Sequence, residues 1–375
     1  MRFVSMSAAG LGHIHPLIPL ARAAAAAGDE VLFAVSAEGT ATVDAFGFPA
    51  VAIPYGDPAE IGQAWSQLPE RDLNTYVTAE IFTRIQGLAA LPAQQAAIES
   101  FQADLVISAE VSAHVAAESR GVASAFLGIA ALDIADLDWT RVAQAAAAVR
   151  EAAGLPRTER LPYEAGIRYL SPVPPLLWNN PGLLPDNAIW YRHEDAEGPV
   201  VAPTGTSSSR RRIYATLGSI AGANDFGRPT FSVMLDALGR LDADVLFTIG
   251  PFDPAQLSDP PANVTVSPYE PQSRAMTCDA AIIHAGAGTT VAALARGLPL
   301  VAVPMFADQM HNADRLVAQQ LGIRVDLAKI AEQLVPAVES VLRDPTYRVN
   351  AQRVSEAIAA RPTPAQAMEI LRSAL

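Results

Sequence analysis

Short apolar runs alternate with alanine-rich segments along the chain, and this alternation limits its possible folds more than any other feature. We expect strands at Arg2–Ser7 and Glu30–Val35, and helices between them at Pro16–Ala27 and after them at Ala37–Phe46. Further strand-like runs are Ala50–Ile53, Asp104–Ser108 and Ala123–Leu127. Buried strands without polar alternation, each followed by a helix, are typical of a parallel sheet covered on both faces. We therefore expect a doubly wound α/β fold.

The alternation stops once and then begins again. Residues 194–212, EDAEGPVVAPTGTSSSRRR, are rich in Pro, Gly, Ser and charge and show no period, so they indicate a linker. The strand-like runs that follow are Arg212–Leu217, Val245–Ile249, Val264–Val266, Ala280–His284 and Leu300–Pro304, with helices expected near 228–240, 287–296 and 307–321. A chain of 375 residues also exceeds one typical core. We therefore predict domains at 1–195 and 212–360, a linker at 196–211, and a last helix, 361–375, that could pack back on the first domain.

Charge and composition exclude several classes of partner. Lys and Arg number 26 against 39 Asp and Glu, and the net charge of −13 repels nucleic acid and anionic membranes. The single cysteine, Cys278, excludes an intramolecular disulfide and a cysteine-based zinc site. The start, MRFVSMS, lacks the apolar core of a signal peptide, and the alanine run that Gly28 ends is too short to span a membrane. We expect a cytoplasmic protein without a membrane span, and its oligomeric state stays open.

Each half has one glycine turn between a strand and a helix, the place where doubly wound sheets bind ligands. These turns are Ala8-Ala9-Gly10-Leu11-Gly12-His13 and His284-Ala285-Gly286-Ala287-Gly288-Thr289. A helix N-terminus there offers free N–H groups and a positive dipole end to a phosphate. The dehydrogenase fingerprint needs a third glycine three residues after the second, and these positions hold His15 and Val291. The spacing therefore disfavours a nicotinamide enzyme.

Three segments near the second turn and two elsewhere form a longer pattern. They are GHIHPL at 12–17, ATLGS at 215–219, NVTVSPYEPQ at 263–272, CDAAIIHAGAGTT at 278–290 and ADQMHNA at 307–313. In this order they closely resemble the motifs of family 1 glycosyltransferases, and most closely those of the bacterial branch that decorates antibiotics and other natural products. The resemblance covers both halves of the chain. It implies the GT-B fold, in which two Rossmann-like domains face each other across a cleft.

The resemblance implies that the second domain binds a UDP- or dTDP-sugar. Tyr269 would stack on the base, in a position where the family commonly has Trp. The diphosphate would contact the glycine turn, and Asp308 and Gln309 would hydrogen-bond the sugar hydroxyls. The implied donor-binding residues are Ser219, Tyr269, Gln272, His284, Gly286, Gly288, Thr289, Asp308, Gln309 and Asn312.

The family's general base is the histidine of the first turn, which is His13 here. An imidazole with a pKa near 6.5 can take the proton of an acceptor hydroxyl during attack. The family often steadies this histidine with a carboxylate after the strand that corresponds to Asp104–Ser108. That position holds Ala109, with Glu110 one place later. Either the turn is one residue longer and Glu110 serves, or the relay is missing.

The acceptor and metal assignments rest on weaker patterns. Four aromatic residues fall where the family receives its acceptor, and they could equally be ordinary core residues: Trp65, Tyr76, Phe82 and Trp139. Asp242-Ala243-Asp244 mimics the D-x-D metal motif of another glycosyltransferase architecture, but it precedes a strand and lies at no ligand turn. We therefore predict neither a metal nor a cofactor.

These observations favour an inverting glycosyltransferase that moves a hexose or deoxyhexose to a hydroxyl of an apolar natural product. Two other classes stay open. A GT-B sugar-nucleotide epimerase would need additional acidic side chains near the anomeric centre, and the first turn supplies His13 instead. A non-catalytic sugar-nucleotide-binding partner is supported by Ala109 in the acidic position.

Overall fold

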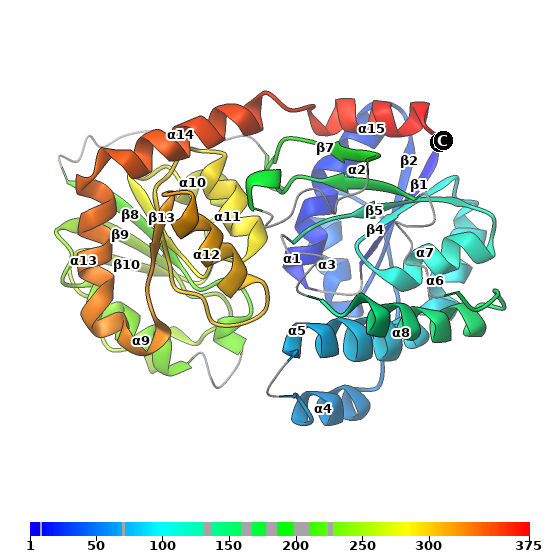
Figure 1. Ribbon diagram of the computed structural model, residues 1–375, viewed down its shortest axis with the longest axis horizontal. Coiled ribbons are helices and arrows are strands. Elements are labelled where there is room, and N and C mark those ends of the chain that lie inside the picture. The colour runs from blue at the N-terminus through cyan, green and yellow to red at the C-terminus, as the bar shows by residue number, and fades with distance from the viewer. Residues whose placement is uncertain are drawn as a thin grey trace. The chain divides into compact units, whose positions relative to one another are not determined.

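The computed structural model describes residues 1–7, 10–69, 72–130, 137–158, 167–177, 186–198, 210–223 and 228–375. Ala8 and Ala9 of the first glycine turn and residues 199–209 of the predicted linker lie outside this range. The chain forms two compact units (Figure 1). Unit 1 comprises Met1–Pro172, Asn180–Tyr191 and Pro362–Leu375, and unit 2 comprises Val173–Asn179 and Arg192–Arg361.

Unit 1 is built on a parallel sheet whose described strands follow the order β3-β2-β1-β4-β5-β6-β7. The strands are β1 (Arg2–Ser7), β2 (Glu30–Val35), β3 (Ala50–Ala52), β4 (Leu105–Ser108), β5 (Ala123–Leu127), β6 (Arg168–Ser171) and β7 (Ala188–Trp190). Met6 of β1 lies opposite Ser108 of β4, so the turns that follow these strands leave the same edge of the sheet. This edge carries the segments that contain His13 and Glu110.

Alanine-rich helices cover this sheet. They are α1 (Leu11–Ile14), α2 (Ile18–Ala26), α3 (Ala37–Ala45), α4 (Pro58–Ser66), α5 (Leu73–Tyr76), α6 (Gly87–Phe101), α7 (Val111–Ser119), α8 (Trp139–Ala152) and α15 (Pro364–Ser373). A π-helical segment, η2 (Val77–Gln86), joins α5 to α6, and the 3₁₀ turn η1 (His15–Leu17) joins α1 to α2. Small side chains such as Ala113 and Ala116 let α7 pack closely with α6 on Val4 and Met6. The last helix, α15, packs against α2.

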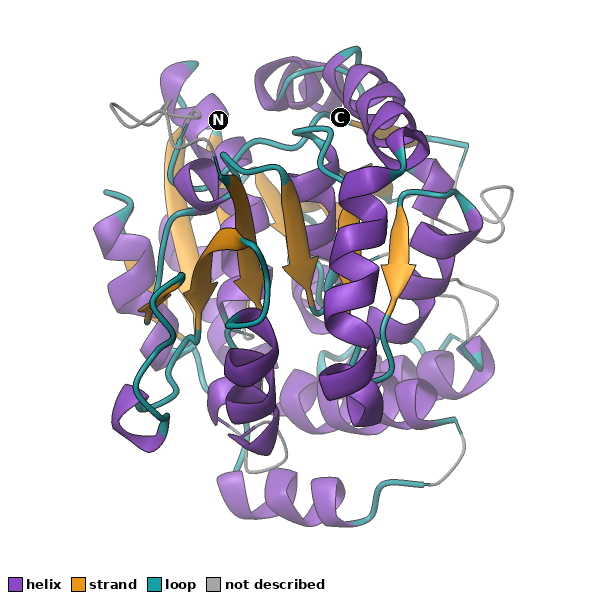
Figure 2. Ribbon diagram, turned by 90° about the vertical axis from the view of Figure 1, so that its left-hand side faces the viewer, coloured by secondary structure: helices purple, strands orange, loops and turns teal. Residues whose placement is uncertain are grey.

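Unit 2 repeats the architecture with the strand order β10-β9-β8-β11-β12-β13, again parallel (Figure 2). Its strands are β8 (Arg211–Thr216), β9 (Ala243–Thr248), β10 (Val264–Ser267), β11 (Ala280–Ile283), β12 (Leu300–Ala302) and β13 (Gly322–Arg324). Its helices are α9 (Arg228–Leu238), α10 (Gln272–Ala275), α11 (Ala287–Leu294), α12 (Gln309–Ala318), α13 (Ile330–Arg343) and α14 (Pro345–Ala359), with 3₁₀ turns η5 (Pro175–Leu177), η7 (Ala221–Ala223), η8 (Pro254–Gln256) and η9 (Leu327–Lys329). The apolar faces of α9 and α13 enclose the core on one side of the sheet.

The predicted fold class is confirmed, because both units are parallel sheets with helical crossovers. The predicted strands lie within two residues of the observed ones. None of the helices in the described ranges combines the length and apolar character that crossing a membrane requires.

Candidate active site

The glycine turn of unit 2 connects β11 to α11 through His284, Ala285 and Gly286. Ala285 has a φ of +64°, which is an unfavourable conformation for a residue with a Cβ. The buried side chain of Asn312 stabilises it, because Asn312 Nδ2 donates to the Ala285 carbonyl oxygen at 2.8 Å. Asn312, the fourth residue of α12, therefore fixes the shape of the turn before α11.

The imidazole of His284 lies between two glycines from adjacent strand ends. Thr216 of β8 is paired with Ile283 of β11, so the turns that follow these strands are neighbours. A Cβ on Gly218 would lie 2.7 Å from His284 Nε2, and a Cβ on Gly286 would lie 2.5 Å from the same atom. Gly218 also has a φ of +80°. Residues other than glycine at these two positions would displace the histidine.

Burial lowers the pKa of His284 to about 4, so its ring is neutral near pH 7. Its Nδ1 is buried and has no hydrogen-bond partner among the described residues. A neutral imidazole carries one N–H donor, and a nearby anion would raise its pKa by favouring the charged form. The ring is therefore equipped to hydrogen-bond an anionic ligand.

The N-terminus of α11 presents further donors beside this histidine. Gln272 Nε2 donates to Thr289 Oγ1 at 3.1 Å, which orders the first turn of the helix. A Cβ on Gly288 would meet nothing within 4 Å, so the space beside this residue is open. Ser219 lies in the exposed turn after β8. Free N–H groups, a helix dipole and open space together suit a phosphate group.

The residues at the start of α12 form a connected set. Asp308 accepts a hydrogen bond from Asn312 Nδ2 at 2.8 Å and interacts with the backbone of Ala287. Burial nevertheless raises the pKa of the Asp308 carboxyl. Gln309 is buried, and its Oε1 accepts hydrogen bonds from the backbone N–H groups of Met305 at 2.9 Å and Phe306 at 3.2 Å. Asn312 and Gln309 thus shape the turns, and their direct contact with a donor stays a prediction.

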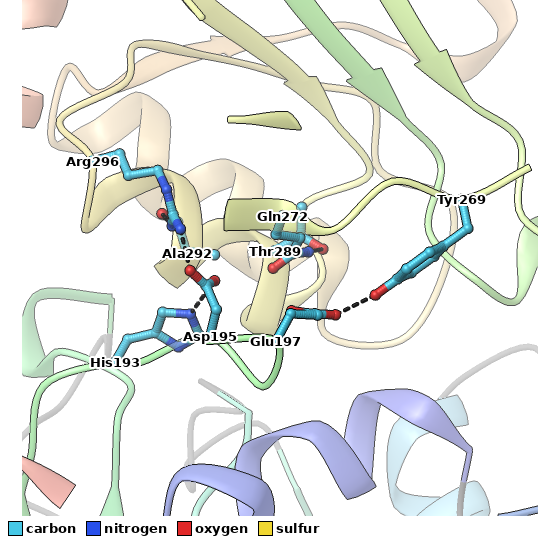
Figure 3. A network of polar contacts seen from close by, with 8 residues as sticks. All are labelled: His193, Asp195, Glu197, Tyr269, Gln272, Thr289, Ala292 and Arg296. Carbon is cyan, nitrogen blue, oxygen red and sulfur yellow. Dashed lines mark hydrogen bonds and ion pairs between the residues drawn. The ribbon is translucent and has the colours of Figure 1, made fainter. Parts of the chain in front are cut away.

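Tyr269 lies in the loop after β10, with 53% of its surface exposed. Its carbonyl oxygen accepts a hydrogen bond from Ser267 Oγ at 2.9 Å, and its hydroxyl donates to the carboxylate of Glu197 (Figure 3). Burial, and then the contact with Glu197, raise the pKa of the Tyr269 phenol above its ordinary value. The sequence did not single out Glu197.

Unit 1 places His13 in α1, directly after the turn that ends β1. Burial lowers the pKa of His13 to about 4, so the ring is neutral near pH 7 and can accept a proton. Its Nδ1 has no hydrogen-bond partner in the described part of the chain. Glu110 therefore makes no hydrogen bond to this nitrogen here, and the proposed relay stays a prediction.

The turn after β4 is held by two buried side chains. Ser108 Oγ donates to the Met6 carbonyl at 2.8 Å and accepts from the Glu110 N–H at 3.0 Å. His114 Nε2 lies 3.1 Å from the Ser108 carbonyl oxygen, and the carboxylate of Glu110 adds to the effect of burial in raising the pKa of Tyr55. Glu110 is thus the N-cap residue of α7, at the sheet edge that also carries His13.

Acidification should destabilise the protein through His114, which is 1% exposed and whose pKa burial lowers to about 4. In the unfolded chain His114 becomes protonated below about pH 6.5, whereas in the native protein it stays neutral down to about pH 4. The free energy of unfolding therefore falls as the pH is lowered across this window. We expect a loss of about 2 kcal/mol from this group at pH 5. Urea unfolding at pH 7.5 and pH 5.0 measures it. His114→Gln should show a smaller difference between the two pH values, and an unchanged difference would contradict the assignment.

The four predicted acceptor residues lie on neighbouring elements of unit 1. Trp65 on α4 and Phe82 on η2 are 45% and 43% exposed. Tyr76 instead donates from its hydroxyl to the Ala64 carbonyl at 3.3 Å, and Trp139 packs on Ala79 and Val142. Two of the four rings therefore help to pack the helices, and the acceptor role of all four stays a prediction.

Comparison with known proteins adds to this geometry. Residues 232–373 match the model of the erythromycin biosynthesis protein CIII-like C-terminal domain. The chain is 29% identical to the L-demethylnoviosyl transferase of Streptomyces niveus, over 98% of this chain and 97% of that protein. In sequence and fold the chain is therefore similar to the GT-B glycosyltransferases of antibiotic biosynthesis.

Solved structures of glycosyltransferases share the whole fold. The glycosyltransferase SnogD from Streptomyces nogalater is 26% identical with a TM-score of 0.77, over 100% of this chain and 99% of that one. The spinosyn rhamnosyltransferase SpnG, solved with thymidine diphosphate, has a TM-score of 0.80 at 22% identity, over 99% of this chain and 100% of that one. The latter likeness shows the shared fold.

The acidic pair Asp242 and Asp244 lies at the start of β9, at the opposite end of the unit 2 sheet from the glycine turn before α11. Both carboxylates form ion pairs with Arg210, at 3.2 Å and 3.4 Å. Within the described ranges, no group of three or more His, Cys, Asp or Glu side chains is arranged to hold a metal ion.

Proposed function

We propose that this protein is a glycosyltransferase that moves a hexose or deoxyhexose from a dTDP- or UDP-sugar to a hydroxyl of a small apolar acceptor, with inversion at the anomeric carbon. The observation that carries the proposal is the position of His284, between Gly218 and Gly286 and beside the N-terminus of α11. This arrangement suits the diphosphate of a nucleotide sugar. The thymidine diphosphate bound by a structural relative supports the choice of ligand.

In the proposed reaction the diphosphate is the leaving group. Negative charge grows on its bridging oxygen as the bond to the anomeric carbon breaks. The positive end of the α11 dipole and the N–H of His284 would stabilise that charge, together with the Thr289 hydroxyl. These groups would carry the charge without a metal ion.

His13 would act as the general base. The acceptor oxygen forms a bond to the anomeric carbon from the face opposite the diphosphate, while its proton passes to the His13 imidazole. The neutral state of His13 near pH 7 supports this role, because a protonated ring could not accept the proton. Glu110 would steady the ring if it approaches during transfer.

Gly288→Ala tests the phosphate site with little effect on the fold. The new Cβ meets no protein atom within 4 Å and falls in the space that we assign to the diphosphate. We expect dTDP affinity to fall by about tenfold or more, since one lost charge-assisted hydrogen bond accounts for that factor. Calorimetric titration measures the affinity, and thermal unfolding should show an unchanged or slightly higher Tm. Unchanged dTDP affinity would contradict the phosphate assignment.

The stereochemistry of the product tests the proposed mechanism. A donor with an axial leaving group should give a product with the opposite anomeric configuration, read from the coupling constant of the anomeric proton by NMR. Retention of configuration would exclude direct displacement by an acceptor that His13 deprotonates.

A further inference from the structure

The segment Arg192–Gly198 of unit 2 combines exposed and buried residues. Arg192 and Glu194 are each 41% exposed at the side chain and pair with one another. His193, Asp195 and Glu197 instead contact other side chains of the same segment or of the body of unit 2 (Figure 3). These three side chains therefore attach the segment to the unit.

Asp195 anchors this face. Its side chain is 6% exposed and forms an ion pair with Arg296, which follows α11, while His193 Nε2 lies 3.4 Å from its other oxygen. Arg296 also donates to the Ala292 carbonyl at 2.7 Å and so caps the end of α11. Burial alone would raise the pKa of Asp195, but His193 and Arg296 lower it below its ordinary value. A buried, doubly paired carboxylate holds the backbone two residues before Glu197 firmly in place.

Glu197 in turn restrains Tyr269. The ring is half exposed, and few contacts would otherwise fix the rotation of its side chain. The backbone is tethered through Ser267, and the phenol donates a charge-assisted hydrogen bond to Glu197. The backbone of Tyr269 is thus held by its own loop, and its hydroxyl is held by the segment that Asp195 anchors.

We propose that Glu197 is a positioning residue of the donor site, which holds the Tyr269 ring in the orientation that stacks on the nucleotide base. This inference rests on the proposed function, which assigns Tyr269 to the base. A ring already fixed by Glu197 loses little conformational freedom when the nucleotide binds, and this raises affinity for the base. The diphosphate contacts do not depend on it.

Calorimetric titrations of dTDP and UDP into wild type, Glu197→Gln, Tyr269→Phe and the double variant test the proposal. Tyr269→Phe removes the hydrogen bond, and Glu197→Gln removes the negative charge that strengthens it, so we expect each to weaken nucleotide binding by about threefold to tenfold. The double variant should bind about as weakly as either single variant, because both act through one contact. The donor KM should rise by the same factor, with kcat at saturating donor unchanged.

Two controls separate positioning from a general structural role. Glu194→Gln changes the neighbouring carboxylate that pairs with Arg192, and it should bind dTDP like wild type. Inorganic pyrophosphate lacks a base, so its Kd, measured by direct calorimetric titration, should be equal in wild type and Glu197→Gln. Wild-type affinity in Glu197→Gln, additive losses in the double variant, or an equal loss of pyrophosphate binding would overturn the inference. Failure of wild type to bind either nucleotide would instead overturn the proposed function.

Discussion

His13→Ala is expected to abolish sugar transfer while leaving nucleotide binding intact. Without the imidazole, the acceptor hydroxyl has no group to receive its proton, and general base catalysis typically contributes about 10²–10⁴-fold. We therefore expect kcat to fall by this factor. His13 belongs to unit 1 and the proposed donor-binding residues belong to unit 2, so we expect the Kd for dTDP to stay within about twofold of wild type. Initial rates and calorimetry on the same preparation measure both.

His15→Ala provides the matched control for this variant. His15 follows in η1 and packs edge-on against Phe46 with ring centroids 5.6 Å apart. Its loss should leave kcat within about threefold of wild type, because packing losses lower stability before they lower the rate of a folded enzyme. Near-wild-type turnover in His13→Ala would show that another group takes the proton.

Gly218→Ala is expected to impair donor binding by moving His284. The new Cβ would lie 2.7 Å from the imidazole, and the backbone φ of +80° adds strain. The displaced ring would no longer reach the diphosphate, and a hydrogen bond to a charged group is worth about 1.5–3 kcal/mol. We expect the Kd for dTDP to rise by about 10–100-fold, as measured by calorimetry.

Gly239→Ala separates this effect from destabilisation alone. A Cβ there would lie 2.6 Å from Pro261, so the substitution also crowds unit 2, but it does so away from His284. Both variants should have a lower Tm, and only Gly218→Ala should lose affinity. Equal affinity losses in the two variants would show that His284 has no special role in donor binding.

The positions of most strands along the chain, and of the ligand turns, could be predicted from local patterns. Buried strands and glycine spacing are encoded within a few consecutive residues, so β1, β11 and the turn at Gly286 were predictable. The strands β6, β7 and β13 were not predicted, because Arg168–Ser171, Ala188–Trp190 and Gly322–Arg324 are short, and the first and last of these runs carry charge. Their pairing depends on neighbouring strands rather than on their own composition.

The site was predictable as a set of residues but not as a set of contacts. Nothing near His284 in the sequence shows that Gly218 packs against its ring, because the pairing of β8 with β11 brings them together. Likewise, the ion pair of Asp195 with Arg296 joins residues 101 positions apart. Glu197 lay in a stretch whose composition indicates only a linker, so its contact with Tyr269 had no local signal.

The central claim is that this protein transfers a sugar to an acceptor, and acceptor-dependent nucleotide release tests it most directly. Wild-type protein is incubated with dTDP- and UDP-sugars, with and without a panel of polyphenols and macrolides, and free nucleoside diphosphate and product mass are followed. We predict nucleotide release and a glycosylated product only when an acceptor is present. Release of nucleotide with an altered free sugar in the absence of acceptor, or tight nucleotide binding without release under any condition, would contradict the claim.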